Sequence, residues 1–106
     1  MKTMKKRIIY RQGDMLIERV AKTKGEPQKP VDGRIILAYG EATGHHHSIE
    51  ADAADWWKDG EDQFVEVRRA TQVTHQEHAP IALSPGKYQV RRQREYHPQE
   101  IRRVAD

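Results

Sequence analysis

The apolar residues of this chain come in short runs that are separated by turn-forming residues. The clearest run, Arg34–Tyr39, carries apolar side chains at both odd and even positions. A strand with two apolar faces is typical of the middle of a sheet. No run approaches the roughly 20 apolar residues that a membrane-spanning helix needs. The sequence therefore predicts a mostly β protein that does not insert into a membrane.

Alternating and β-branched residues predict further strands along the chain. They are Arg7–Tyr10, Met15–Val20, His45–Glu50, Phe64–Arg69, Thr71–His75, Ile81–Leu83 and Tyr88–Gln93. The pair Pro85-Gly86 is typical of a type II turn, because proline presets φ and glycine accepts a positive φ. The last two strands are therefore predicted to form a hairpin. Pro98–Asp106 predicts a short C-terminal helix with Pro98 in its first turn.

A chain of 106 residues has the length of one domain. Residues 22–33, with prolines among lysines, predict a loop, and residues 51–62, which are acidic and contain Trp56 and Trp57, predict a loop or a short helical turn. Together these features predict a single domain over residues 1–106, a small β-barrel or sandwich with a short C-terminal helix. Only 36% of the residues are hydrophobic. We therefore expect a bound metal ion or a second copy, in a homo-oligomer, to support the thin core.

Charge is distributed unevenly along the chain. Residues 1–34 carry a balance of +6, residues 41–66 a balance of −7 and residues 67–106 a balance of +4. Such blocks either pair within the fold or face separate partners, and the sequence leaves both open. The basic N-terminus is not followed by the apolar stretch of a signal peptide. A cytoplasmic location is therefore expected.

Histidines form the pattern that points most directly to chemistry. Five of the six fall in two groups, His45-His46-His47 and the pair His75 and His78. Side chains alternate along a strand, so His45 and His47 would share a face with their Cα atoms about 6–7 Å apart. Both imidazoles could then bind one ion at about 2.1 Å. Since the chain has no cysteine, any metal must be held by imidazole and carboxylate.

A third ligand has to come from a distant part of the chain, and His78 or His75 is the candidate. In a regular strand these two would point to opposite faces, so only one would join unless a turn intervenes. Glu50 and Glu77 are candidate ligands, or partners that fix an imidazole tautomer. Such ligands admit Zn, Fe, Mn and Ni alike. Alternatively, the histidines form an exposed turn that binds metal only adventitiously.

One segment resembles the first metal motif of the cupins, in which a glycine-led strand carries H-x-H and a later glutamate. The residues in comparable places are Gly40, His45, His47 and Glu50. The resemblance implies a β-barrel with a metal site. Glu50 comes one residue earlier than the pattern requires. The second cupin motif, Pro-x-Gly soon followed by histidine, is not met, because Pro85 and Gly86 are adjacent and the histidine groups precede them.

No residue pattern specifies a reaction. A metal ion held by three imidazoles would acidify a bound water and act as a Lewis acid. The same histidines could serve as general acids or bases without a metal. Nucleophile elbows, P-loops and dinucleotide fingerprints are absent from the sequence. Thr43–His47 and Gln93–Tyr96 also resemble segments of small uncharacterised bacterial proteins, which implies no function, so whether this protein is an enzyme stays open.

The alternative function is nucleic-acid binding by a basic face. On an extended segment, Tyr88, Arg92, Arg94 and Tyr96 share one side, where tyrosines can stack on bases and arginines can bind phosphates. The sequence pI of 9.3 agrees with this interpretation. The same positions also suit a strand whose aromatic residues lie in the core. A third interpretation is an accessory interaction module that uses the adjacent tryptophans and the acidic segment.

Overall fold

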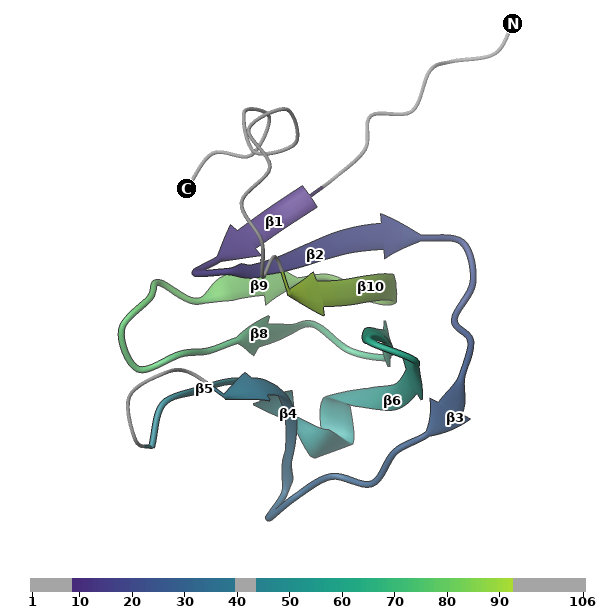
Figure 1. Cartoon of the computed structure of the whole chain (residues 1–106), viewed down its shortest axis with the longest axis horizontal. Helices are drawn as coiled ribbons and strands as arrows, with labels where there is room; N and C mark the ends of the chain where they lie inside the picture. Colours follow the sequence, from purple (N-terminus) through teal and green to yellow (C-terminus); the bar gives the residue numbers. More distant parts are fainter. Residues whose placement is uncertain (1–8, 40–43, 93–106) are drawn as a thin grey trace, which may run out of the picture.

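The computed structural model describes residues 9–39 and 44–92, which form strands and one short 3-10 turn. In chain order they are β1 (Ile9–Gln12), β2 (Met15–Val20), β3 (Glu26–Pro27), β4 (Arg34–Tyr39), β5 (His46–Glu50), η1 (Ala51–Ala53), β6 (Ala54–Asp59), β7 (Asp62–Val67), β8 (Thr71–Val73), β9 (Ile81–Leu83) and β10 (Gly86–Arg92) (Figure 1). The prediction of a mostly β single domain is confirmed. The predicted C-terminal helix, Pro98–Asp106, lies outside the described residues. Within the described ranges, no helix has the length and apolarity to cross a membrane.

Six strands form one antiparallel sheet in the order β1-β2-β10-β7-β6-β3. Strands β4 and β5 pair with each other, as do β8 and β9. The outer strands β1 and β3 do not pair, so the sheets do not close into a barrel and that part of the prediction is wrong. Strand β3 has two residues, and its Pro27 has no backbone N–H to donate, which makes it a natural sheet edge.

One core joins the six-stranded sheet to the two smaller sheets. It contains Met15, Ile17, Ile35, Leu37, Ala38, Ile49, Ala54, Trp56, Val65, Val67, Val73, Leu83, Tyr88 and Val90. In β2, β7 and β10 the core residues recur at every second position, as the strand period requires. The core residues of β5, β8 and β9 therefore hold the histidine-bearing part of the chain against the large sheet.

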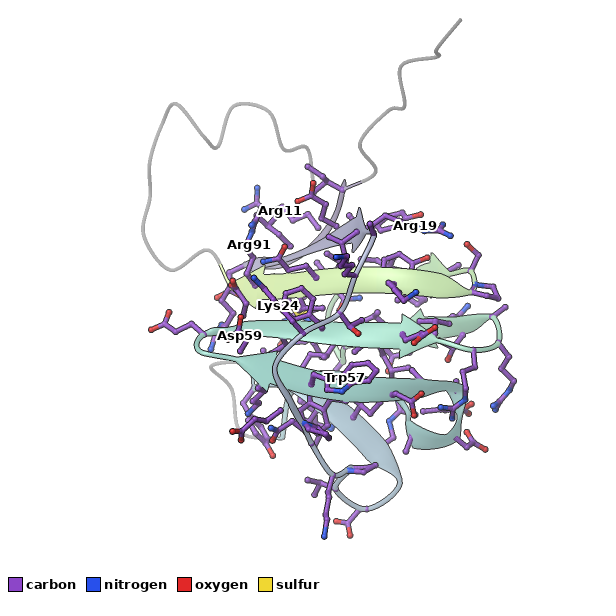
Figure 2. All side chains as sticks on the ribbon, turned by 90° about the vertical axis from the view of Figure 1, so that its right-hand side faces the viewer. Arg11, Arg19, Lys24, Trp57, Asp59 and Arg91 are labelled. Carbon is purple, nitrogen blue, oxygen red and sulfur yellow. The ribbon has the colours of Figure 1, made fainter. Side chains whose placement is uncertain are left out.

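Residues 51–62 begin with the short helical turn η1, one of the two alternatives that the sequence predicts, but they also contain the full length of β6, which it does not predict. The two tryptophans point to opposite faces: Trp56 is buried in the core and Trp57 lies on the outer face of the sheet, partly exposed. Figure 2 looks at this outer face, where the segment between β2 and β3 crosses the sheet near Trp57. Its Lys24 pairs with Asp59 of β6 at 3.8 Å.

The predicted hairpin between residues 81–83 and 88–93 is wrong. Strand β9 pairs with β8, whereas β10 lies between β2 and β7 in the large sheet. Ser84 and Pro85 therefore carry the chain from one sheet to the other. Pro85 does lie in a bend, but Gly86 is the first residue of β10 with φ +155°, so the predicted type II turn is not formed. The local sequence could not show which strand pairs with β10, because both edges of β10 pair with strands that are distant in sequence, β2 and β7.

The close approach of the β2–β3 segment to β6 depends on Gly25. Its φ is +105°, and a Cβ at this position would overlap the carbonyl oxygen of Lys58. We expect Gly25→Ala to lower the free energy of unfolding by about 3 kcal/mol, because strain and backbone overlap add. Gly60→Ala is the control, since φ there is +66° and a Cβ would meet nothing within 4 Å. It should cost about 1 kcal/mol from strain alone, and equal losses in urea unfolding would contradict the prediction.

Candidate metal centre

A backbone bridge between β5 and the segment after β8 brings the two histidine groups together. The Ser48 N–H donates to the Thr74 carbonyl at 3.1 Å, and the Thr74 N–H donates to the Ser48 carbonyl at 2.9 Å. Because the bridge is antiparallel, it places His47 opposite His75. Arg34 reinforces the bridge, since its Nη2 donates to Ser48 Oγ and to Thr74 Oγ1, each at 3.0 Å.

Four histidine rings lie in consecutive contact at this junction. The ring centroids of His47 and His75 are 4.4 Å apart, and those of His75 and His78 are 4.7 Å apart. His45 lies 5.6 Å from His75, and His78 lies 6.2 Å from His47. Two imidazoles that share one tetrahedral ion have centroids about 5 Å apart. The four predicted ligand residues are therefore brought together, and His75 is at their centre.

His46 lies apart from this cluster of His45, His47, His75 and His78, which we call the histidine cluster. Its ring packs edge-on against Tyr39 of β4 at 6.4 Å, and its backbone N–H donates to Gln76 Oε1 at 2.8 Å. This is the alternation that the sequence predicts for residues 45–47. His47, by contrast, is 3% exposed and forms the floor of the cluster.

Gln12, at the end of β1, contacts the cluster on its buried side, at His47. No sequence pattern indicates this residue. It is 2% exposed. Its Oε1 lies 2.7 Å from His47 Nδ1, and its Nε2 donates to the carbonyls of Val73 at 3.2 Å and Ala79 at 2.8 Å. The neighbouring Gly13 keeps the turn open, because a Cβ there would lie 3.0 Å from His78 Nε2.

Burial and crowding favour the neutral form of the central imidazoles. Burial, followed by the nearby His75, lowers the pKa of His47 to about 4. Burial also lowers the pKa of His75, followed by the charges of His78 and His45. Neutral imidazole is the form that binds a metal ion. The central members of the cluster are therefore ready to bind without first losing a proton at neutral pH.

The two candidate carboxylates take different positions. Glu77 Oε2 lies 3.2 Å from His45 Nδ1, and the Glu77 N–H donates to His75 Nδ1 at 3.0 Å. Glu50 follows His47 by three residues and pairs with Arg69 at 3.3 Å on the exposed surface. Glu77 is thus part of the cluster's rim, whereas Glu50 is engaged elsewhere.

The ligand atoms do not converge on one point. Within residues 9–39 and 44–92, no three histidine, aspartate or glutamate side chains are placed so that they could hold a metal ion. One cause is visible at His75, whose Nδ1 accepts the backbone hydrogen bond from Glu77. His75 and His78 lie on the loop between β8 and β9, and His78 is exposed. Rotation of these two side chains would be needed for all four rings to face one ion.

The residues predicted for nucleic-acid binding do not form a surface within the described ranges. Tyr88 is 1% exposed, and its hydroxyl donates to the Ser84 carbonyl at 2.7 Å. It cannot stack on a base in this position. Arg92 pairs with Asp14 at 3.0 Å. Arg94 and Tyr96 lie outside the described residues.

Comparison with known proteins yields a family without an assigned activity. Residues 11–93 match the family described as "Domain of unknown function (DUF8820)". No curated protein and no solved structure matches the chain. The matched range includes Gln12 and all four residues of the histidine cluster.

The pKa of His47 predicts how stability depends on pH. The folded-state pKa of about 4 lies below the ordinary value of 6.5, so the unfolded chain binds the proton more readily between these values. Stability should therefore fall as the pH drops through this window, by about 3 kcal/mol in total. Urea unfolding of the metal-free protein should show this loss, and His47→Gln should reduce it to the part that comes from the lowered pKa of His75. An NMR titration that gives His47 an ordinary midpoint would contradict the prediction.

Proposed function

We propose that this chain, which belongs to the family of the Domain of unknown function (DUF8820), binds a divalent transition-metal ion through His45, His47, His75 and His78. The observation that carries the proposal is the consecutive contact of four imidazole rings, with centroids 4.4–6.2 Å apart, from two separate segments. Protonated rings at such distances repel each other. A bound cation would instead accept the lone pairs of the neutral rings, so metal binding would account for their close approach.

His45 and His47 each have a partner at Nδ1, so Nε2 of each ring remains to bind an ion. The Glu77 carboxylate faces His45 Nδ1 at 3.2 Å, and the Gln12 side-chain oxygen faces His47 Nδ1 at 2.7 Å. Histidines that bind metals are commonly held in this way, with one ring nitrogen on a carboxylate or carbonyl group and the other on the ion. His47 lies in β5 and His45 directly precedes this strand, which supports them as the fixed part of the site.

The other two histidines would complete the site by moving. Rotating His75 breaks its hydrogen bond with the Glu77 N–H, and a hydrogen bond of this kind contributes about 1 kcal/mol. His78 is exposed, so its side chain can change rotamer without displacing a core residue. The cost of bringing these rings to an ion is therefore small beside the apparent binding free energy of about 10 kcal/mol or more that structural zinc sites reach.

The position of the cluster at the surface bears on its chemistry. His47 forms the floor while His78 lies in solvent, so an ion bound here would be reached by water from one side. A water in an open coordination position becomes more acidic, and the ion acts as a Lewis acid. Zn, Fe, Mn and Ni all accept imidazole ligands, so the metal has to be identified by measurement.

The test uses the full chain without a polyhistidine tag, stripped of metal and titrated with Co²⁺ and Zn²⁺. We expect binding of one ion per chain, and the bound Co²⁺ should give the visible absorption band of an ion in a site of low symmetry. His47→Ala should weaken the affinity at least about a hundredfold, because it removes the fixed ligand. His46→Ala is the matched control, since it removes an adjacent imidazole that faces Tyr39.

Two results would overturn the proposal. One is the absence of binding at micromolar metal concentrations in the unsubstituted chain. The other is an equal loss of affinity in His46→Ala and His47→Ala, which would indicate nonspecific binding by exposed histidines. Elemental analysis of the purified protein, before stripping, identifies the metal that it carries.

A further inference from the structure

We propose that Gln12 is a positioning residue that holds His47 in the Nδ1–H tautomer and thereby presents the Nε2 lone pair to the histidine cluster. The effect on metal binding rests on the function proposed above, whereas the tautomer itself is a property of the metal-free protein. Gln12 belongs to β1, far in sequence from both histidine groups, and no motif includes it.

The orientation of the Gln12 amide follows from its surroundings. Its Nε2 lies 3.2 Å from the Val73 carbonyl oxygen and 2.8 Å from the Ala79 carbonyl oxygen. Carbonyl oxygens only accept hydrogen bonds, so both must face the NH₂ group. A flipped amide would place three oxygens together and leave the NH₂ group facing His47. The Gln12 oxygen therefore faces His47 Nδ1.

This orientation decides which nitrogen of His47 carries the proton. The amide oxygen is an acceptor, so the close contact of 2.7 Å requires a hydrogen on Nδ1. His47 is 3% exposed and its Nδ1 faces a neutral amide rather than a carboxylate, so burial favours the neutral ring, and Nε2 is then without a hydrogen. The described residues include no hydrogen-bond donor to this Nε2 atom. Free histidine prefers the opposite tautomer, so the contact with Gln12 reverses the intrinsic preference.

The same amide holds the loop that carries the other two ligands. Val73 and Ala79 stand immediately before and after residues 74–78. By donating to both carbonyls, Gln12 fixes the two ends of this loop against the residue that orients His47. One buried side chain thus sets the tautomer of the fixed ligand and the position of the movable ones.

Three substitutions separate these roles. Gln12→Met keeps the length of the side chain and removes all three hydrogen bonds. Gln12→Glu keeps an acceptor for His47 Nδ1 and loses both bonds to the loop. Gln63→Met is the matched control, because Gln63 bridges the Trp56 indole at 2.8 Å and the Leu37 carbonyl at 2.6 Å in the same way, away from the histidines.

The first readout is the tautomer of His47 in the metal-free, ¹⁵N-labelled full chain near neutral pH. Long-range ¹H–¹⁵N correlation spectra report which ring nitrogen is protonated, and His47→Gln assigns the signal. We expect the Nδ1–H tautomer in the unsubstituted chain, in Gln12→Glu and in Gln63→Met, and its loss in Gln12→Met. An Nε2–H tautomer in the unsubstituted chain would overturn the inference, whether or not Gln12→Met folds.

The second readout is Co²⁺ affinity, which should fall about tenfold to a hundredfold in Gln12→Met, as for other residues that orient a metal-binding histidine. Gln63→Met should retain the affinity despite a comparable loss of stability. A lost tautomer with unchanged affinity would overturn the positioning role. If the tautomer behaves as expected and no chain binds metal, the proposed function fails while the tautomer assignment stands.

Discussion

The bridge between Ser48 and Thr74 is the interaction on which the functional part of this structure depends. Its two backbone hydrogen bonds, at 3.1 and 2.9 Å, join the β4–β5 pair to the β8–β9 pair. Without it, the two histidine groups would belong to separate hairpins. Register matters as much as contact, because a shift by one residue would turn His47 away from His75 and bring His46 into its place. The Arg34 bonds to both side-chain oxygens oppose such a shift.

The histidine cluster was largely predictable because its signal is periodic. The spacing of His45 and His47 needs only the alternation of an extended segment, and the ring of His46 does lie elsewhere, against Tyr39. The choice between His75 and His78 was not predictable, since both lie beyond the end of β8 in a loop without a regular period. Gln12 was invisible for a different reason. A glutamine before a turn has no distinguishing pattern, and its importance arises only from long-range contacts.

The misjudged segments of the fold share one cause. Residues 54–59 are acidic and polar on the exposed side, so they resembled a loop, yet Ala54 and Trp56 alternate into the core. Pro85 lies in a bend between β9 and β10, but the partner of each strand is decided by contacts across the whole domain. In both cases the local composition was a poor guide, because pairing with strands distant in sequence decided the backbone conformation.

Several acidic residues of the charge blocks pair with arginines rather than with the histidine cluster. Arg68 and Arg69 bind the acidic residues around η1 on the exposed surface, where solvent screens such pairs and they contribute little to stability. Asp14, whose charge reaches His47, is held by Arg92 at 3.0 Å. Glu77 alone among the predicted carboxylates lies at the rim. An ion in this cluster would therefore be held mainly by neutral donors and would keep most of its positive charge, which favours Lewis-acid chemistry over purely structural binding.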